Sequence, residues 1–126
     1  MSTPARRPRK KPSPIPASVT QAVEAALDKK AIDLVLLDMR DSLSFTDFFV
    51  ICTGANVRQV QAIADAVDDA LRARGVKPAL VEGYARADWV LIDYFDFIVH
   101  IFAPMTRDFY ALERLWGDAK RVELSA

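Results

Sequence analysis

The sequence predicts an α/β (α+β) domain with a mixed β-sheet of about five strands and helices packed on it. Three segments carry apolar residues at helical spacing, and near-continuous apolar runs lie between them. The resulting order, α-β-β-α-β-β-β-α, places strands next to each other in the chain, which favours antiparallel neighbours over a fully parallel sheet. With 126 residues, 52% of them hydrophobic, the chain is long enough for one domain with a buried core.

The first half of the chain predicts one helix and two strands. Ser18 is the expected N-cap of the helix, and Gln21 lies three residues further on, as in a capping box. The apolar stripe of this helix consists of Val19, Val23, Ala26 and Leu27. The expected elements are a helix over 17–31, a buried strand over 32–40, a turn over 41–46 and a second buried strand over 47–54.

The second half predicts the longest helix, three strands and a last helix. Asn56 is the expected cap of the long helix and Gly75 its terminating residue. Its apolar stripe consists of Val57, Val60, Ile63, Val67 and Leu71. The remaining elements are a strand over 79–83, two strands within 88–103 that are hinged near Asp93–Asp96, and a helix that Pro104 and Thr106 begin and Gly117 ends.

Charge is distributed unequally along the chain. Residues 1–11 contain five basic and no acidic residues, so the remainder holds 12 basic against 17 acidic residues, a net charge of −5. An acidic body is a poor platform for phosphate backbones and suits a basic protein partner better. We expect a disordered, basic, Pro-rich tail over 1–16, a folded domain over 17–120 and a C-terminal tail over 121–126. The basic tail is typical of a solubilising leader, with weak rRNA contact as the alternative.

Several kinds of chemistry find no support in the sequence. Four glycines form neither a P-loop nor a dinucleotide-binding turn, and a single His and a single Cys are too few for a zinc site, so no cofactor or metal is expected. His100 alternates with Ile98 and Phe102, which favours a hydrogen-bonded structural imidazole. Cys52 lies in an apolar strand, where burial raises a thiol pKa. No apolar run is long enough to span a membrane, and no signal-peptide pattern occurs, so a cytoplasmic protein is expected.

Paired carboxylates leave one enzymatic alternative. Asp47 together with Asp93 or Asp96 could hold magnesium for nucleotidyl transfer, if neighbouring strands bring them together. No Gly-Ser loop precedes them to hold a nucleotide phosphate, however, and aspartates in turns are more often structural.

Aromatic residues are concentrated near the C-terminus. Phe109, Leu112 and Trp116 share one helical face, while Tyr110 and Leu115 point elsewhere. This surplus of apolar residues is typical of a broad buried face or of a protein interface, where Trp, Tyr and Arg serve as anchors. Both readings stay open from the residues alone.

Five motifs in order resemble the ribosomal silencing factor family, also called Iojap-like. The motifs lie between residues 17 and 120 and are SFTDFFVICTG with the following R.V.AIAD (44–65), VEG (81–83), ADWVLID (87–93), VHIF (99–102) and RDFYALERLW (107–116). The resemblance implies a fold like that of nucleotidyltransferases, without their catalytic loop. It also implies a non-enzymatic translational repressor that binds large-subunit ribosomal protein fourteen and blocks joining of the small subunit. Plant and mitochondrial relatives act in organelle ribosome assembly, which is a second alternative.

The resemblance also implies which residues face the partner. Carried over motif by motif, they are Asp88, Trp89, Asp93, Tyr94, Arg107, Tyr110, Glu113 and Trp116. Surplus aromatic surface is compatible with a homodimer when the protein is free. One residue departs from the family pattern, because Phe95 stands where Gly is usual in the hinge. Since Gly permits positive φ and Phe disfavours it, Phe95 predicts another turn type or a wider hinge.

Overall fold

The computed structural model describes residues 14–41, 46–110 and 120–122. In chain order its elements are α1 (Ala17–Asp28), β1 (Ile32–Asp38), β2 (Phe48–Thr53), α2 (Val57–Arg72), β3 (Leu80–Glu82), β4 (Trp89–Asp93), β5 (Phe97–Phe102), α3 (Pro104–Tyr110) and β6 (Lys120–Arg121). The predicted fold class and element order are confirmed, and β6 is an additional strand. The domain boundary expected at residue 120 falls inside β6, whereas residues 1–13 of the expected basic tail and residues 123–126 lie outside the described residues.

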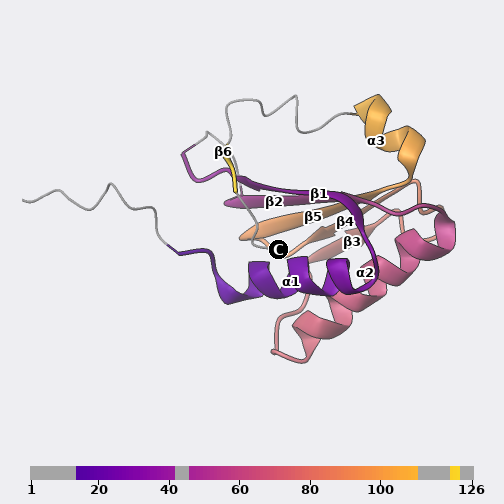
Figure 1. Cartoon of the computed structure of the whole chain (residues 1–126). Helices are drawn as coiled ribbons and strands as arrows, with labels where there is room; N and C mark the ends of the chain where they lie inside the picture. Colours follow the sequence, from indigo (N-terminus) through magenta and orange to yellow (C-terminus); the bar gives the residue numbers. More distant parts are fainter. Residues whose placement is uncertain (1–13, 42–45, 111–119, 123–126) are drawn as a thin grey trace, which may run out of the picture.

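All six strands form one sheet in the order β3-β4-β5-β2-β1-β6 (Figure 1). The central strands β2 and β5 run parallel, and every other neighbouring pair is antiparallel. Each residue of β2 and β5 is buried. Since the side chains of these two strands are buried on both faces of the sheet, their sequences are apolar without alternation.

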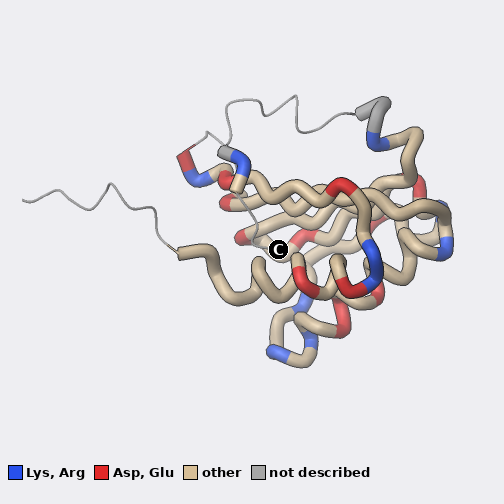
Figure 2. Tube along the Cα trace, in the orientation of Figure 1, with Lys and Arg blue, Asp and Glu red and all other residues tan. Residues whose placement is uncertain are grey.

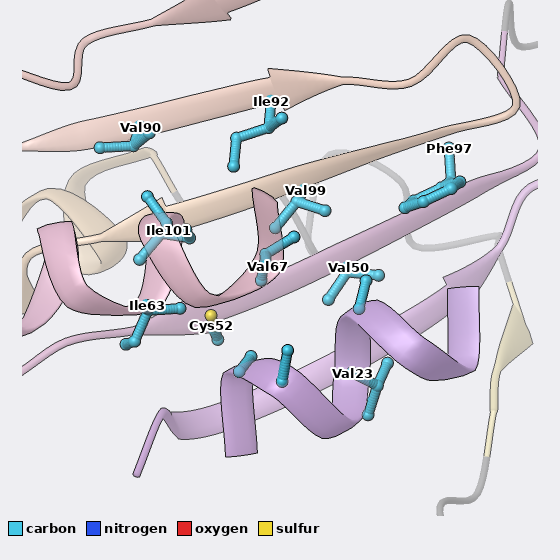
Figure 3. Close-up of a cluster of buried hydrophobic side chains, with 14 of the residues drawn as sticks. Val23, Val50, Cys52, Ile63, Val67, Val90, Ile92, Phe97, Val99 and Ile101 are labelled. Atoms are coloured by element: carbon cyan, nitrogen blue, oxygen red, sulfur yellow. The ribbon is translucent and has the colours of Figure 1, made fainter. Parts of the chain in front are cut away.

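Two apolar layers lie on opposite faces of the sheet. α1 and α2 cover one face, while α3 lies on the other side, where β5 ends (Figure 1). Figure 3 shows the helix-covered face, where Val23, Ile63 and Val67 approach Val50, Cys52, Val99 and Ile101. The opposite face, called the second face below, carries Leu37, Met39, Phe49, Ile51, Ile98 and Phe102, all buried. Each buried aliphatic or aromatic side chain stabilises the fold by about 1.5–3 kcal/mol.

The start of α1 differs from the prediction. Pro16 rather than Ser18 is the N-cap, no side chain caps the helix, and the amides of Val19 and Thr20 donate to the Pro16 carbonyl. Proline suits this position because its fixed φ is compatible with a helix start and it has no N–H that needs a partner. Val19, Val23 and Ala26 are buried as expected, but Leu27, at the end of the stripe, is 47% exposed.

The predicted boundaries of α2 are confirmed. The Asn56 side chain accepts a hydrogen bond from the amide of Gln59, and Gln59 reciprocates by accepting from the amide of Ala55. This reciprocal pair resembles a capping box, except that the Gln59 side chain accepts from the amide of the residue before the N-cap. Gly75 takes φ +82°, the left-handed conformation that ends a helix. The predicted stripe is buried from Val60 onward, whereas Val57, in the first turn, is 50% exposed.

The hinge between β4 and β5 corrects the expectation for Phe95. Phe95 itself takes φ +71°, so the chain keeps a tight turn without glycine. The amide of Asp96 donates to the carbonyl of Tyr94 at 2.8 Å, a three-residue γ-turn with Phe95 at its centre. Two further bonds fix this conformation, because the Asp93 carboxylate accepts from the Phe95 amide and Thr46 donates to the Phe95 carbonyl. The hinge is therefore narrow, and its strain is held by neighbouring groups.

Candidate partner-binding surface

The side chains of the second face become more accessible toward the edge of the sheet that β3 forms. Residues paired across β3 and β4 are Leu80 with Asp93 and Glu82 with Leu91, and Trp89 follows by period-two alternation. We call these five residues the β3–β4 strip. Trp89, Leu91 and Asp93 are half-buried, while Leu80 and Glu82 are exposed. Farther across the same face, Phe49, Ile51 and Ile98 are buried, so accessibility increases from the centre toward β3.

Trp89 is the largest side chain of the strip and is held by aromatic neighbours. Its ring stacks on Phe102 with centroids 5.1 Å apart, because the register pairs these two residues across β4 and β5. The indole Nε1 donates a hydrogen bond of 3.1 Å to Nδ1 of His100. A half-exposed, rigid aromatic residue of this kind is a typical anchor for a protein partner.

His100 is a buried neutral imidazole. Burial lowers its pKa from 6.5 to about 4. Since an indole N–H can only donate, Nδ1 is the acceptor and the ring proton lies on Nε2. This Nε2 is buried and has no hydrogen-bond partner in the described part of the chain, a situation that costs ~1–3 kcal/mol. The predicted structural, hydrogen-bonded imidazole is confirmed, with Trp89 as its partner.

The connection from β3 into the strip is fixed by α2. Tyr84 donates to the Asp65 carboxylate at 2.9 Å, and the Gln61 side chain donates to the Tyr84 carbonyl. Gly83 takes φ +81°, and a Cβ there would lie 2.1 Å from the carbonyl oxygen of Trp89. Only glycine fits this close approach, and it sets the path by which the chain returns to Trp89.

Asp88 links the strip to α3. Its carbonyl accepts hydrogen bonds from the Ala103 amide and the Thr106 hydroxyl, which fixes the start of α3 beside the start of β4. Its carboxylate forms an ion pair with Arg86 at 3.0 Å, in which both side chains are largely accessible. An exposed pair of this kind contributes little to stability. The Asp88 carboxylate can therefore exchange Arg86 for a partner cation at small cost.

Two of the residues expected to face a partner are buried, so that expectation is wrong for them. Tyr94 is 5% exposed and stacks on Phe97 in the helix-covered core, because period-two alternation places it opposite Asp93; burial raises the pKa of its hydroxyl. Arg107 is 8% exposed and donates to the Thr53 hydroxyl and the Asp33 carbonyl. Arg107 thus joins α3 to the ends of β1 and β2 and serves the fold.

The other expected site residues divide into two groups. Trp89 and Asp93 lie on the second face at the two ends of β4, Asp88 directly precedes β4, and one oxygen of Asp93 caps the hinge. The side chain of Tyr110 and the residues Glu113 and Trp116 lie outside the described residues. Sequence reasoning missed Leu80, Glu82 and Leu91. The alternation Trp89–Leu91–Asp93 could have revealed Leu91, whereas the other two require the β3–β4 register.

The carboxylates of the enzymatic alternative are only partly brought together. The Asp47 amide donates to the Asp96 carbonyl at 2.9 Å, so these two exposed residues are neighbours at the hinge. Asp93 is engaged with the Phe95 amide instead. Among the described residues, no group of three or more His, Cys, Asp or Glu side chains could hold a metal ion. Cys52 is fully buried, and burial raises its thiol pKa to about 12, which makes it a poor nucleophile.

Acidic groups dominate the accessible part of the strip. Glu82, Asp88 and Asp93 lie in or beside it, and Arg86 is the nearby cation in the β3–β4 connection. Figure 2 shows that basic residues are distributed over the molecule, with several in the connection after α2. No helix within the described ranges is long and apolar enough to cross a bilayer. The strip thus combines an apolar centre with an acidic border.

These features define a class of protein: an α/β domain with one helix-covered face and an aromatic, acid-bordered second face suited to protein contact. The family model described as ribosomal silencing factor during starvation matches residues 12–126. The chain belongs to the ribosomal silencing factor family.

Similar proteins agree with this assignment in sequence and in fold. The ribosomal silencing factor of Halalkalibacterium halodurans is 47% identical over 103 residues, which cover 82% of this chain and 88% of that protein. The ribosomal silencing factor of Bacillus subtilis is 42% identical over 103 residues, covering 82% and 87%. The crystal structure of a protein from Chromobacterium violaceum superposes with a TM-score of 0.77 at 34% identity and covers 86% of this chain and 90% of its own.

Proposed function

We propose that this protein is a non-enzymatic translational repressor in the cytoplasm that binds the large ribosomal subunit and sterically prevents joining of the small subunit. Membership of the ribosomal silencing factor family supports the ribosome as the target. The proposed partner on the large subunit is ribosomal protein fourteen, which the motif resemblance implies. The observation that carries the proposal is the β3–β4 strip, where a half-exposed Trp89 is bordered by carboxylates.

The composition of the strip fits a basic protein partner. Trp89, Leu91 and Leu80 supply apolar area, and a buried aromatic anchor typically dominates the free energy of an interface. Glu82 and Asp88 border this area with accessible carboxylates, which attract basic side chains and repel RNA phosphates. The attraction acts mainly on the association rate and weakens as salt screens it.

Co-sedimentation with purified large subunits tests the surface. Trp89→Ala removes the proposed anchor and should weaken binding by ~30-fold, since truncation of an interface hot spot costs about 2 kcal/mol or more. Glu82→Lys should reduce affinity chiefly at low ionic strength, where the charge is least screened.

Leu27→Ala is the matched control, because Leu27 is an exposed apolar residue on α1, away from the strip. It should bind like the wild type. Wild-type binding by both Trp89→Ala and Glu82→Lys would remove the strip from the interface. Circular dichroism of each variant establishes that the fold is retained.

A further inference from the structure

The Trp89–His100 pair contains a polar arrangement that packing alone does not require. His100 lies in the apolar second face, 4% exposed, between Ile51 of β2 and Leu91 of β4 in the register of the sheet. An apolar residue would fill this place without leaving a buried nitrogen unsatisfied, yet Nε2 has no partner in the described part of the chain. The other nitrogen, Nδ1, accepts the indole N–H of Trp89.

The geometry of the pair restricts the indole in two independent ways. Stacking on Phe102 at an interplanar angle of 26° fixes the plane of the Trp89 ring. Stacking alone allows the ring to flip by half a turn about χ2, because both orientations present a flat face to Phe102. The hydrogen bond to Nδ1 selects the orientation in which Nε1 points toward β5. Phe49 in turn holds the imidazole by an edge contact, with centroids 4.8 Å apart and planes at 79°.

We propose that His100 is a positioning residue for partner docking, which fixes the Trp89 indole in its binding orientation before the partner arrives. The proposal rests on the proposed function, since it assumes that Trp89 contacts the partner. A side chain that is ordered before binding loses less rotamer entropy when the complex forms, so preorganisation increases affinity without adding a contact. His100 itself contacts no partner, because it is buried beneath the strip.

Two substitutions separate positioning from packing. His100→Phe keeps an aromatic ring of similar size and removes both nitrogens, so it abolishes the bond to Trp89 while removing the unsatisfied Nε2–H. His100→Asn loses the ring but places an amide oxygen where Nδ1 was, so it retains an acceptor for the indole. If His100 positions Trp89, His100→Asn should bind more tightly than His100→Phe, whereas His100→Phe should be the more stable of the two.

The first measurement is made on the free protein. In nitrogen-15 NMR, the Trp89 indole resonance is assigned by its loss in Trp89→Phe, and its hydrogen exchange is followed in each His100 variant. His100→Phe should accelerate indole exchange by ~10-fold, the factor expected for loss of one hydrogen bond, while His100→Asn stays close to the wild type. Unchanged exchange in His100→Phe would overturn the proposal.

The second measurement compares affinity for large subunits with thermal stability. His100→Phe should bind ~5-fold more weakly than the wild type but unfold at the same or a higher temperature. His100→Asn should unfold at a lower temperature and bind nearly as well as the wild type. If affinity instead follows stability in both variants, His100 has only a packing role and the proposal is wrong.

Trp89→Ala separates failure of this proposal from failure of the proposed function. If Trp89→Ala loses binding and His100→Phe does not, the strip stays in the interface and His100 positioning is refuted. If Trp89→Ala binds like the wild type, the role of Trp89 as an anchor is refuted together with the positioning role of His100, and if Glu82→Lys also binds like the wild type, the docking surface itself is refuted.

Discussion

The His100 imidazole titrates far below the usual range of histidine because the second face excludes water from it. Its pKa is lowered from 6.5 to about 4 by burial. The unfolded chain therefore binds a proton near pH 6.5, whereas the folded chain resists protonation until about pH 4. The contribution of the neutral His100 to stability is fully present above pH 6.5. It decreases as the pH falls from 6.5 toward 4, and below about pH 4 it decreases no further.

The corresponding prediction concerns the difference between wild type and His100→Phe. Between pH 7.5 and pH 4.5 the free energy of unfolding of the wild type should fall by about 2–3 kcal/mol more than that of the variant, at ~1.4 kcal/mol per pH unit below 6.5. Urea unfolding at each pH gives the free energy of unfolding of both proteins. Subtracting the value of the variant from that of the wild type removes the pH dependence that the carboxylates contribute to both. A difference independent of pH, or a His100 imidazole that titrates above pH 5 in NMR, would contradict this account.

Single residues also mark where sequence reasoning reached its limit. Trp89 and Asp88 were expected to face a partner from the family resemblance, whereas His100 was expected to be a structural residue from strand alternation. Tyr94 follows the same alternation, but its exposure could not be judged because it depends on α2 packing over that end of the sheet. Arg107 looked like a surface cation, since nothing in the sequence indicates that the Thr53 hydroxyl and the Asp33 carbonyl converge on it.

At the scale of elements, the γ-turn at Phe95 is the least expected feature. A non-glycine residue in the left-handed region costs roughly 1–2 kcal/mol, and the side chain gains little in return because it is 73% exposed. The turn persists because Asp93, Thr46 and Asp96 satisfy its backbone groups. Long-range contacts of this type, 49 residues apart for Thr46 and Phe95, cannot be inferred from local turn propensities.

Phe95→Gly should therefore stabilise the protein. The gain is expected to be about 0.5–1 kcal/mol, since relief of the strained φ is partly offset by the greater backbone entropy of glycine in the unfolded chain. Urea unfolding at neutral pH measures it, with Phe95→Ala as the control, because alanine removes the ring but keeps the strain. Equal stabilities of the glycine and alanine variants would show that the turn is not strained.

Most elements were predictable because their signals are local. The buried runs of β2 and β5, the Asn56 cap and the Gly75 stop act within a few residues, and the structure confirms them. β6 was missed because two residues that pair with Leu37 and Asp38 have no strand pattern of their own. The cap of α1 was misplaced because Ser18 satisfies the composition rule, while Pro16 provides the backbone geometry.

At the scale of the whole molecule, the two faces of one sheet have different roles. The helix-covered face holds the larger core, formed by α1 and α2 against the strands. The second face holds a smaller core that grades into the accessible β3–β4 strip. This division lets Trp89 and its neighbours be rigid without being fully buried. The strip could not be delineated from sequence, since it requires the strand order β3-β4-β5 and the register that joins Leu80 to Asp93.

We propose above all that this protein prevents joining of the ribosomal subunits by occupying a surface of the large subunit through the β3–β4 strip. The most direct test is joining of purified small and large subunits, followed by light scattering and sucrose-gradient profiles, with the protein in excess over large subunits. The account predicts fewer joined ribosomes with the wild type and with Leu27→Ala, and normal joining with Trp89→Ala. Normal joining in the presence of bound wild-type protein, or equal inhibition by Trp89→Ala, would contradict it.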